Sequence, residues 1–292
     1  MKKFNSLGEL LVDYREYNGI SQNEFADNVN VDVRTVQRWE RDVTLVKPDK
    51  EEEIVLATLL PYQLIRNLNA SVPIPTFYDF LIRKYSLTPL TNELPDAGWF
   101  KAQINIKTNR LRKIDFDFDI KHIVHFIESQ HNDNHNVNKE LIRAAIKLLP
   151  DLNVVLTDDS GYYVGHSIIL PLKEETYLKL RNRKLRKDEI RVSDLVNPND
   201  QKRPIFFNYD VTADCNDNIF YIVCDFLRYF RDFEKDYLFC SYTERPDSLK
   251  LTEQVGIKVI WEDKLRMEEL GIDVAPRFTE GNYKEFLSDL IS

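Results

Sequence analysis

Apolar positions in the first third of the chain recur at the three- and four-residue spacing that places side chains on one face of a helix. Residues 7–17 carry apolar side chains on such a face, and Gly19 follows them where a helix C-cap is expected. Ser21 and Glu24 then match a capping box, in which each side chain accepts a hydrogen bond from the other residue's backbone amide. Asp32 is placed to cap a third helix. The pattern predicts three short helices separated by tight turns.

Two more helices are predicted before the pattern changes. Residues 51–60 and 61–68 keep the helical periodicity, and two prolines then interrupt it. The sequence therefore predicts an all-α five-helix domain over residues 1–68. The connector that follows, residues 69–110, contains a predicted helix at 77–85.

From residue 111 onward, helical segments alternate with short apolar runs typical of strands. Residues 153–157 and 162–170 form a predicted β-hairpin, because the Asp-Asp-Ser-Gly sequence between them favours a tight turn. The other predicted elements, in chain order, are helices at 120–129 and 139–149, a strand at 205–211, a helix at 219–233, a strand at 237–242, a helix at 248–255 and a strand at 258–261. A hairpin followed by a β-α-β-α-β series predicts a mixed sheet with helices on its faces.

The predicted fold class is multidomain, with an all-α five-helix domain followed by an α+β mixed-sheet domain. The predicted boundaries are 1–68 for the helical domain, 69–110 for a connector, 111–265 for the mixed-sheet domain and 266–292 for a C-terminal extension. A chain of 292 residues is long enough for two such domains, each with its own core.

The composition indicates a folded protein and limits its expected location. Hydrophobic residues make up 43% of the chain and charged residues 30%, as in globular proteins. The N-terminus lacks the apolar core of a secretion signal, and no later stretch has the roughly 18 uncharged apolar residues of a membrane span. Three cysteines without a C-x-x-C pair favour structural thiols over zinc or redox chemistry. We therefore expect a cytoplasmic protein with no membrane partner.

The first three predicted helices carry a set of residues at defined spacings, namely Ile20-Ser21-Gln22, Phe25-Ala26, Val31, Thr35-Val36 and Trp39-Glu40. Over residues 7 to about 66, this set resembles the helix-turn-helix domain of phage repressors, the Cro and cI (XRE) family. Asn30 and Asp42 stand where the family commonly has glycine. Both residue types tolerate the left-handed conformation that such turns need, so the fold is expected to survive these departures.

This resemblance implies how the domain binds double-stranded DNA. In the family the third helix lies in the major groove, and the N-terminus of the second helix meets the phosphate backbone. The match assigns DNA binding to Gln22, Val33, Arg34, Thr35, Gln37 and Arg38. Either arginine is suited to clamp a guanine with two nitrogens, worth about 1–3 kcal/mol of discrimination. The alternative is that these residues form only the solvated face of an amphipathic helix.

The charge of the chain opposes DNA binding and restricts it to a local contact. The net charge at pH 7 is -8, and residues 1–66 contain nine Lys and Arg against twelve Asp and Glu. A domain of this charge repels phosphate overall. We therefore expect salt-sensitive binding, which formation of a homodimer would strengthen.

Two segments of the predicted mixed sheet carry a second set of motifs. Val164-Gly165-His166 leads into an apolar run at 168–172, and Gln254-Val255-Gly256-Ile257 precedes the last predicted strand. Together with the predicted strand order, these segments resemble the GNAT acetyltransferase superfamily over roughly residues 110–265.

The GNAT resemblance implies a coenzyme A site, but the chain departs from the family at two functional motifs. The family holds the coenzyme A pyrophosphate in a glycine-rich turn, whereas residues 212–218 contain no glycine and no cation. Asp214 and Asp217 in this turn would repel a pyrophosphate. Thr252 occupies the position of a frequent tyrosine general acid. We therefore expect no cofactor, with acetyl-CoA disfavoured, and a non-catalytic domain that senses a ligand or forms oligomers.

Two further features each allow a functional and a structural interpretation. His122, His125, His131 and His135 form either a metal site or a polar helix face with a solvated loop. Residues 179–187 carry six positive charges, suited to DNA phosphates, to an acidic partner, or simply to a solvated helix with acidic neighbours. The structural interpretation is favoured for both.

The sequence predicts a sequence-specific transcriptional regulator of bacterial or phage type. Its expected partners are double-stranded DNA, a second copy of the chain in a homodimer, and a small-molecule or protein effector. One alternative is an acetyl-CoA-dependent N-acyltransferase with an appended DNA-binding domain, supported by the GNAT-like strand order. Another is an antitoxin or other interaction protein whose DNA binding is autoregulatory.

Overall fold

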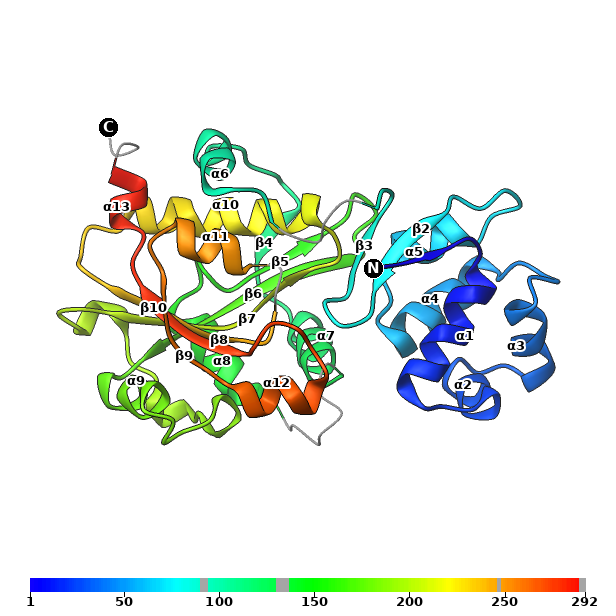
Figure 1. The fold of residues 1–292 in the computed structure, drawn as a ribbon, viewed down its shortest axis with the longest axis horizontal. Helices are drawn as coiled ribbons and strands as arrows, with labels where there is room; N and C mark the ends of the chain where they lie inside the picture. The colour runs from blue at the N-terminus through cyan, green and yellow to red at the C-terminus, as the bar shows by residue number, and fades with distance from the viewer. Residues whose placement is uncertain (90–93, 130–136, 246–247, 289–292) are drawn as a thin grey trace. The chain divides into compact units, whose positions relative to one another are not determined.

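The computed structural model describes residues 1–89, 94–129, 137–245 and 248–288 of the chain. The chain forms two compact units, which Figure 1 shows with their helices and strands labelled. The first unit contains Met1–Asn92 together with Asp214–Asn216, and the second contains Glu93–Ala213 together with Asp217–Ser292.

Five helices of the first unit lie where the sequence pattern predicts them. They are α1 (Leu7–Asn18), α2 (Gln22–Asn28), α3 (Val33–Glu40), α4 (Pro48–Thr58) and α5 (Tyr62–Leu68). Their apolar faces meet in one core, which includes Leu10, Phe25, Val36, Ile54 and Leu64. Burial of these faces stabilises helices that are too short to persist alone in water.

The turns of the first unit follow local signals in the sequence. Ser21 Oγ accepts from the Glu24 amide at 3.2 Å, and the Glu24 carboxylate accepts from the Ser21 amide at 2.7 Å, which completes the capping box. Asp32 accepts from a backbone amide in the first turn of α3 at 3.1 Å. Asn30 and Asp42 adopt positive φ angles of 49° and 53°, the left-handed conformation expected at both positions.

The prediction of an all-α domain is wrong, because the first unit also contains a three-stranded antiparallel sheet. Its strands are β1 (Lys2–Phe4), β2 (Thr76–Asp79) and β3 (Lys84–Ser86), in the order β1-β2-β3. The predicted helix at 77–85 is also wrong. Asp79 accepts hydrogen bonds from the amides of Leu81 and Ile82, and these bonds turn the chain between two strands. The predicted connector therefore begins as part of this unit.

A seven-stranded mixed sheet forms the centre of the second unit. In spatial order its strands are β4 (Leu111–Lys113), β5 (Val154–Thr157), β6 (Tyr163–Leu172), β7 (Ile205–Ala213), β8 (Leu238–Thr243), β10 (Arg277–Gly281) and β9 (Lys258–Glu262). β7 and β8 run parallel, and the other neighbouring strands are antiparallel. The predicted mixed sheet and its β5–β6 hairpin are confirmed.

The order of the last three strands differs from the prediction. The predicted series ended at β9, with residues 266–292 as an extension, but β10 lies between β8 and β9 and is antiparallel to both. Thr279, for example, pairs with Ser241 of β8 and with Val259 of β9. The described part of residues 266–292 therefore completes the sheet.

Helices cover both faces of this sheet (Figure 1). They are α6 (Ala97–Gln103), α7 (Asp117–Glu128), α8 (Lys139–Leu148), α9 (Glu174–Arg181), α10 (Asn216–Asp232), α11 (Leu249–Gln254), α12 (Lys264–Leu270) and α13 (Lys284–Leu287). Short 3-10 helices lie between α9 and β7, at Lys187–Glu189, Val192–Asp194 and Pro198–Asp200.

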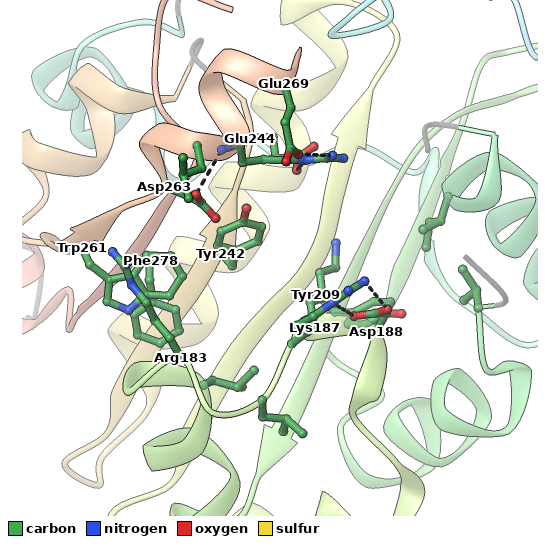
Figure 2. Close-up of a pocket in the computed structure, with 17 residues that line it drawn as sticks. Arg183, Lys187, Asp188, Tyr209, Tyr242, Glu244, Trp261, Asp263, Glu269 and Phe278 are labelled. Carbon is green, nitrogen blue, oxygen red and sulfur yellow. Dashed lines mark hydrogen bonds and ion pairs between the residues drawn. The ribbon is translucent and has the colours of Figure 1, made fainter. Parts of the chain in front are cut away.

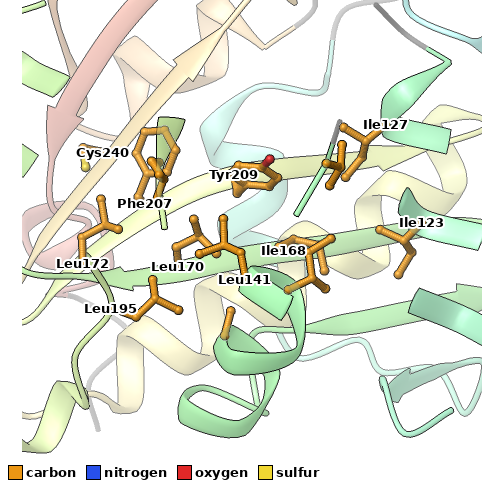
Figure 3. Close-up of a cluster of buried hydrophobic side chains, with 14 of the residues drawn as sticks. Ile123, Ile127, Leu141, Ile168, Leu170, Leu172, Leu195, Phe207, Tyr209 and Cys240 are labelled. Atoms are coloured by element: carbon orange, nitrogen blue, oxygen red, sulfur yellow. The ribbon is translucent and has the colours of Figure 1, made fainter. Parts of the chain in front are cut away.

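Side chains of the central strands alternate between the two faces of the sheet. On one face, Ile168 of β6 belongs to the core that contains Ile123 of α7 and Leu141 of α8 (Figure 3). On the other face, Ile169 of β6 and Phe206 of β7 belong to a core with residues of α10. The sheet thus separates two cores, which follows from the two-residue period of a strand.

Candidate nucleic-acid interface and ligand pocket

α3 presents two cationic side chains on the face opposite the core. Val36 and Trp39 are buried, with 0% and 5% of their surface exposed, whereas Arg34 and Arg38 are exposed and lie one helical turn apart. Within the described residues, neither guanidinium has a hydrogen bond or an ion pair. Both side chains are therefore available to a ligand at this surface.

A hydrogen-bonded network orients two glutamines of the predicted interface. Gln37 Nε2 donates to Gln22 Oε1 at 3.2 Å, and Gln22 Nε2 donates to Glu40 Oε2 at 2.5 Å. Arg15 of α1 donates to both Glu40 oxygens, at 2.5 and 3.1 Å. The Glu40 side chain is only 5% exposed. The network therefore joins α1, α2 and α3 and holds both amide groups in place.

The other predicted contact residues, Val33 and Thr35, make contacts within the first unit. Val33 is half-buried and packs against the core of the first unit, rather than standing free at the surface. The Thr35 hydroxyl donates to Asp32 Oδ2 at 2.7 Å and so supports the N-cap of α3. Arg41, which the sequence pattern did not single out, is exposed and extends the line of the two α3 arginines. Its spacing of three residues from Arg38, about one helical turn, is the signal that could have identified it.

Two carboxylates occupy the N-termini of α2 and α3. Hydrogen bonds from the backbone and side chain of Ser21 lower the pKa of Glu24, and those from the side chain and backbone of Thr35 lower the pKa of Asp32. Both carboxylates are therefore ionised at neutral pH and interact favourably with the helix dipoles. A phosphate that approaches either N-terminus meets a negative charge, which limits its affinity.

The second unit contains a pocket of about 580 Å³ whose aromatic lining comes from four strands (Figure 2). The four rings are Tyr209 of β7, Tyr242 of β8, Trp261 of β9 and Phe278 of β10. Trp261 and Phe278 stack with their centroids 5.5 Å apart, and the Tyr242 ring lies 5.7 Å from Trp261. Burial raises the pKa of Tyr209 and of Tyr242, so both phenols are neutral.

Charged side chains from three segments complete the pocket. The acidic side, from the end of β8 and from α12 with its N-cap, consists of Glu244, Asp263, Arg266 and Glu269. The basic side, from the segment after α9, consists of Arg183, Arg186, Lys187 and Asp188. Apolar walls combined with convergent polar groups are the usual form of a small-molecule site, and this pocket has an unusually large share of charged groups.

Most cations of the basic run at 179–187 form ion pairs or line the pocket within the second unit. Ion pairs hold three of its six cations, namely Lys179 with Glu175, Arg181 with Glu280 and Arg186 with Asp188, at 2.6, 2.9 and 2.8 Å. Arg183 and Lys187 line the pocket. These contacts favour a structural role over phosphate binding.

A smaller pocket of about 140 Å³ is lined by residues of α10, α11 and the opposite face of the sheet. Polar side chains from the strands face it, namely Ser167, Asn208, Ser241 and Thr279. Ser167 Oγ is buried there and has no hydrogen-bond partner in the described chain. Thr252, at the general-acid position implied by the GNAT resemblance, also lines this pocket, and its hydroxyl donates to a backbone carbonyl at 2.7 Å.

The candidate metal-binding histidines are only partly described. His122 packs against Tyr163 with ring centroids 4.4 Å apart, and burial lowers its pKa to about 4. His125 is exposed, while His131 and His135 lie outside the described residues. Among the residues that are described, no three His, Cys, Asp or Glu side chains are grouped to hold a metal ion.

A buried hydrogen-bonded chain, which the sequence pattern did not indicate, links β6 and β7. His166 is 0% exposed, and its Nε2 forms a hydrogen bond with Asp210 Oδ2 at 2.7 Å. The Tyr163 hydroxyl bonds the other ring nitrogen, Nδ1. When Asp210 is ionised, its carboxylate can only accept, so His166 Nε2 carries the proton of this hydrogen bond.

A scan against protein-family models finds no match to this chain, and no curated protein matches it significantly. No helix in the described ranges is both long and apolar enough to span a bilayer. The structure shows a two-unit chain with exposed arginines on one helix of the first unit and a pocket of about 580 Å³ in the second.

Proposed function

We propose that this protein is a transcriptional regulator that binds double-stranded DNA through α3 and an effector through its second unit. The observation that carries the proposal is the exposure of Arg34 and Arg38 on the face of α3 opposite the core, where neither side chain pairs with any residue that the structure describes. A guanidinium presents two parallel donors that match the O6 and N7 acceptors of guanine in the major groove. Two such groups one turn apart suit the reading of nearby base pairs.

The glutamine network supports the same role. Gln22 and Gln37 are held by hydrogen bonds that end on the buried Glu40 carboxylate. Side chains ordered before binding lose less conformational entropy when they contact DNA. A glutamine amide is suited to adenine or to a phosphate oxygen.

A homodimer would offset the net negative charge of the DNA-binding unit. With nine cations against twelve acids in residues 1–66, one copy is expected to bind DNA weakly. Two linked copies reading half-sites about 34 Å apart would add their contacts on a palindromic operator.

The test is a selection of bound sequences from random duplex DNA with the full-length protein. We expect a palindromic motif to be enriched. Arg34→Ala and Arg38→Ala should each weaken binding to that motif by about 5- to 150-fold, the equivalent of about 1–3 kcal/mol, and relax the preference at one position.

The matched control is Lys3→Ala, which removes one positive charge from an exposed position on β1 of the same unit. It should leave the motif and the affinity nearly unchanged. Enrichment of no motif by the wild-type protein would rule out sequence-specific regulation. Equal losses in all three variants would mean that α3 does not read bases.

An acetyl-CoA-dependent acyltransferase is the second candidate, favoured by the hairpin followed by a parallel strand pair joined through α10. The turn before α10 argues against it, because Asp217 places a negative charge in the first turn of that helix. Thermal unfolding with acetyl-CoA decides between the two functions. A ligand at 100 times its dissociation constant adds about 2.7 kcal/mol to stability, and we expect no such shift.

A further inference from the structure

The larger pocket of the second unit separates its charges by sign. Figure 2 shows the carboxylates Glu244, Asp263 and Glu269 together at one side, and Arg183 and Lys187 at the other, with the Tyr242 ring between them. The two groups come from different segments, so the separation is a property of the folded unit and not of one charged stretch of sequence.

Ion pairing on the acidic side leaves negative charge uncompensated. Arg266 serves two carboxylates at once, with Nε 3.2 Å from Glu244 Oε1 and Nη1 3.2 Å from Glu269 Oε2. Asp263 Oδ1 accepts the backbone amide of Arg266 at 3.1 Å, which caps α12. Among the lining residues, three carboxylates against one guanidinium give this side a net charge of -2.

The basic side has the opposite imbalance. Arg186 and Asp188 pair through two hydrogen bonds of 3.0 and 2.8 Å. The Arg183 guanidinium lies 4.4 Å above the Trp261 ring, and the Lys187 amine lies 4.8 Å from the Tyr209 ring. Among the lining residues, three cations against one carboxylate give this side a net charge of +2, and ionised Asp210, which interacts with Lys187, reduces the local charge to +1.

We propose that this pocket binds a zwitterion with an apolar body, namely an amino acid or short peptide with a free α-ammonium and a free α-carboxylate. The ammonium group faces the acidic side, the carboxylate faces the basic side, and the apolar body covers the rings of Tyr242 and Trp261. A ligand with a single charge leaves one of the two sides unmatched. In a partly enclosed pocket that mismatch is costly, because charges there are screened less than in water.

The size of the cavity agrees with this class of ligand. Its volume of about 580 Å³ lies within the roughly 300–1,000 Å³ of typical small-molecule sites. An extended dipeptide is only about 7 Å long, at 3.3–3.6 Å per residue. In the proposed regulator this ligand is the effector, so its regulatory role rests on the proposed function, whereas its binding does not.

The test is calorimetric titration of the full-length protein, without DNA, with three related peptides. Leucyl-phenylalanine carries both charges, N-acetyl-leucyl-phenylalanine lacks the ammonium, and leucyl-phenylalanine amide lacks the carboxylate. We expect the zwitterion to bind at least tenfold more tightly than either analogue.

Two charge-removing variants assign each end of the ligand to its side of the pocket. Glu244→Gln should weaken binding of the dipeptide and its amide but not of the acetylated peptide. Lys187→Gln should weaken binding of the dipeptide and the acetylated peptide but not of the amide. The control is Lys184→Gln, an exposed neighbour that does not line the pocket and should change none of the three affinities.

Three outcomes would overturn the proposal. The first is equal affinity for the zwitterion and one of the two analogues. The second is that neither variant changes any of the three affinities. The third is that none of the peptides binds at millimolar concentration, although thermal unfolding shows that the protein is folded. DNA affinity is then measured with and without the dipeptide. Loss of DNA binding under all conditions would contradict the proposed function, while the calorimetric result would still stand.

Discussion

The role of a single polar residue here depends on partners far away in the sequence. Gln22 stands at the N-terminus of α2, where the sequence predicts a phosphate contact. In the structure its amide nitrogen donates to Glu40 and its oxygen accepts from Gln37. Arg15 and Glu40 are 25 positions apart, so no periodic pattern indicates that they pair. The sequence therefore predicts a contact for the Gln22 amide but gives no sign of the network that orients it.

Asp210 illustrates the opposite case, a carboxylate whose importance only the tertiary structure reveals. Burial opposes its ionisation, but the hydrogen bond from His166 and the charges of His166, Lys187 and Arg245 outweigh that effect and lower its pKa to about 2. An unperturbed aspartate in the unfolded chain titrates near 3.8. Because the folded pKa is the lower one, ionised Asp210 stabilises the native state above pH 3.8, and this contribution is lost as the pH falls towards 2.

We predict that Asp210→Asn lowers the free energy of unfolding at pH 7 by about 2 kcal/mol, the value of the difference between the two pKa values. It should also flatten the decrease in stability between pH 4 and pH 2. The measurement is urea unfolding of both proteins at a series of pH values. Asp200→Asn, at an exposed position, is the control and should retain the wild-type profile. An Asp210→Asn variant with that same profile would contradict the prediction.

At the scale of elements, α1 approaches α3 at one glycine. A Cβ atom at Gly8 would lie 2.7 Å from the Trp39 carbonyl oxygen and 2.8 Å from that of Glu40. The Gly8 amide donates to Asp42 Oδ1 at 3.0 Å, which ties the start of α1 to the turn after α3. Asp42 thus has a tertiary role in addition to its left-handed backbone conformation. This contact fixes how the helix with the two arginines packs on α1.

We predict that Gly8→Ala destabilises the first unit by about 1–3 kcal/mol, because the added methyl group overlaps backbone atoms that cannot rotate away. The loss should exceed the roughly 1 kcal/mol that alanine gains over glycine in a helix. The measurement uses a background protein with the substitutions Trp99→Phe and Trp261→Phe, in which Trp39 is the remaining tryptophan. Its fluorescence during urea unfolding then reports on the first unit. The prediction would be refuted if Gly8→Ala unfolds at a urea concentration equal to or above the unfolding midpoint of the background protein.

Gly98→Ala on α6 is the matched control. Its new Cβ would contact only a carboxylate oxygen of Asp96, at 3.2 Å, and that side chain can rotate. Gly98 belongs to the second unit. The urea midpoint followed by Trp39 fluorescence should therefore equal that of the background protein.

At the scale of the whole molecule, the net charge of -8 makes any DNA contact depend on a few cations. Each phosphate that a cation neutralises contributes about -0.9 to the slope of log affinity against log salt concentration. Arg41 is exposed and lies beyond the last residue of α3. Under the proposed function we expect it to contact the phosphate backbone of DNA rather than base edges.

We predict that Arg41→Ala reduces the magnitude of the salt slope by about 1 for each copy bound and leaves the selected DNA motif unchanged. The measurement is DNA affinity at several salt concentrations. Lys184→Ala is the control, since the basic run of the second unit is not expected to touch DNA. A reduced slope in the Lys184 variant, or an altered motif in the Arg41 variant, would contradict these assignments.

The sequence by itself determined the local structure. The Ser21–Glu24 capping box and the left-handed turn at Asn30 were predictable, and so was the turn before Gly161 in the β5–β6 hairpin. Each depends on residues within four or five positions of one another, so the local chain decides its conformation. The periodicity of the long segments likewise identified most helices and the mixed sheet.

Only the tertiary structure decided which distant segments meet. β1 is three residues long and pairs with β2, more than seventy positions away, and β10 enters the sheet between two strands that precede it in the chain. The Tyr163–His166–Asp210 chain and the charge-separated pocket join residues from several elements in the same way. Such contacts leave no periodic signal, because they depend on how complete elements pack together and not on the spacing of residues within one element.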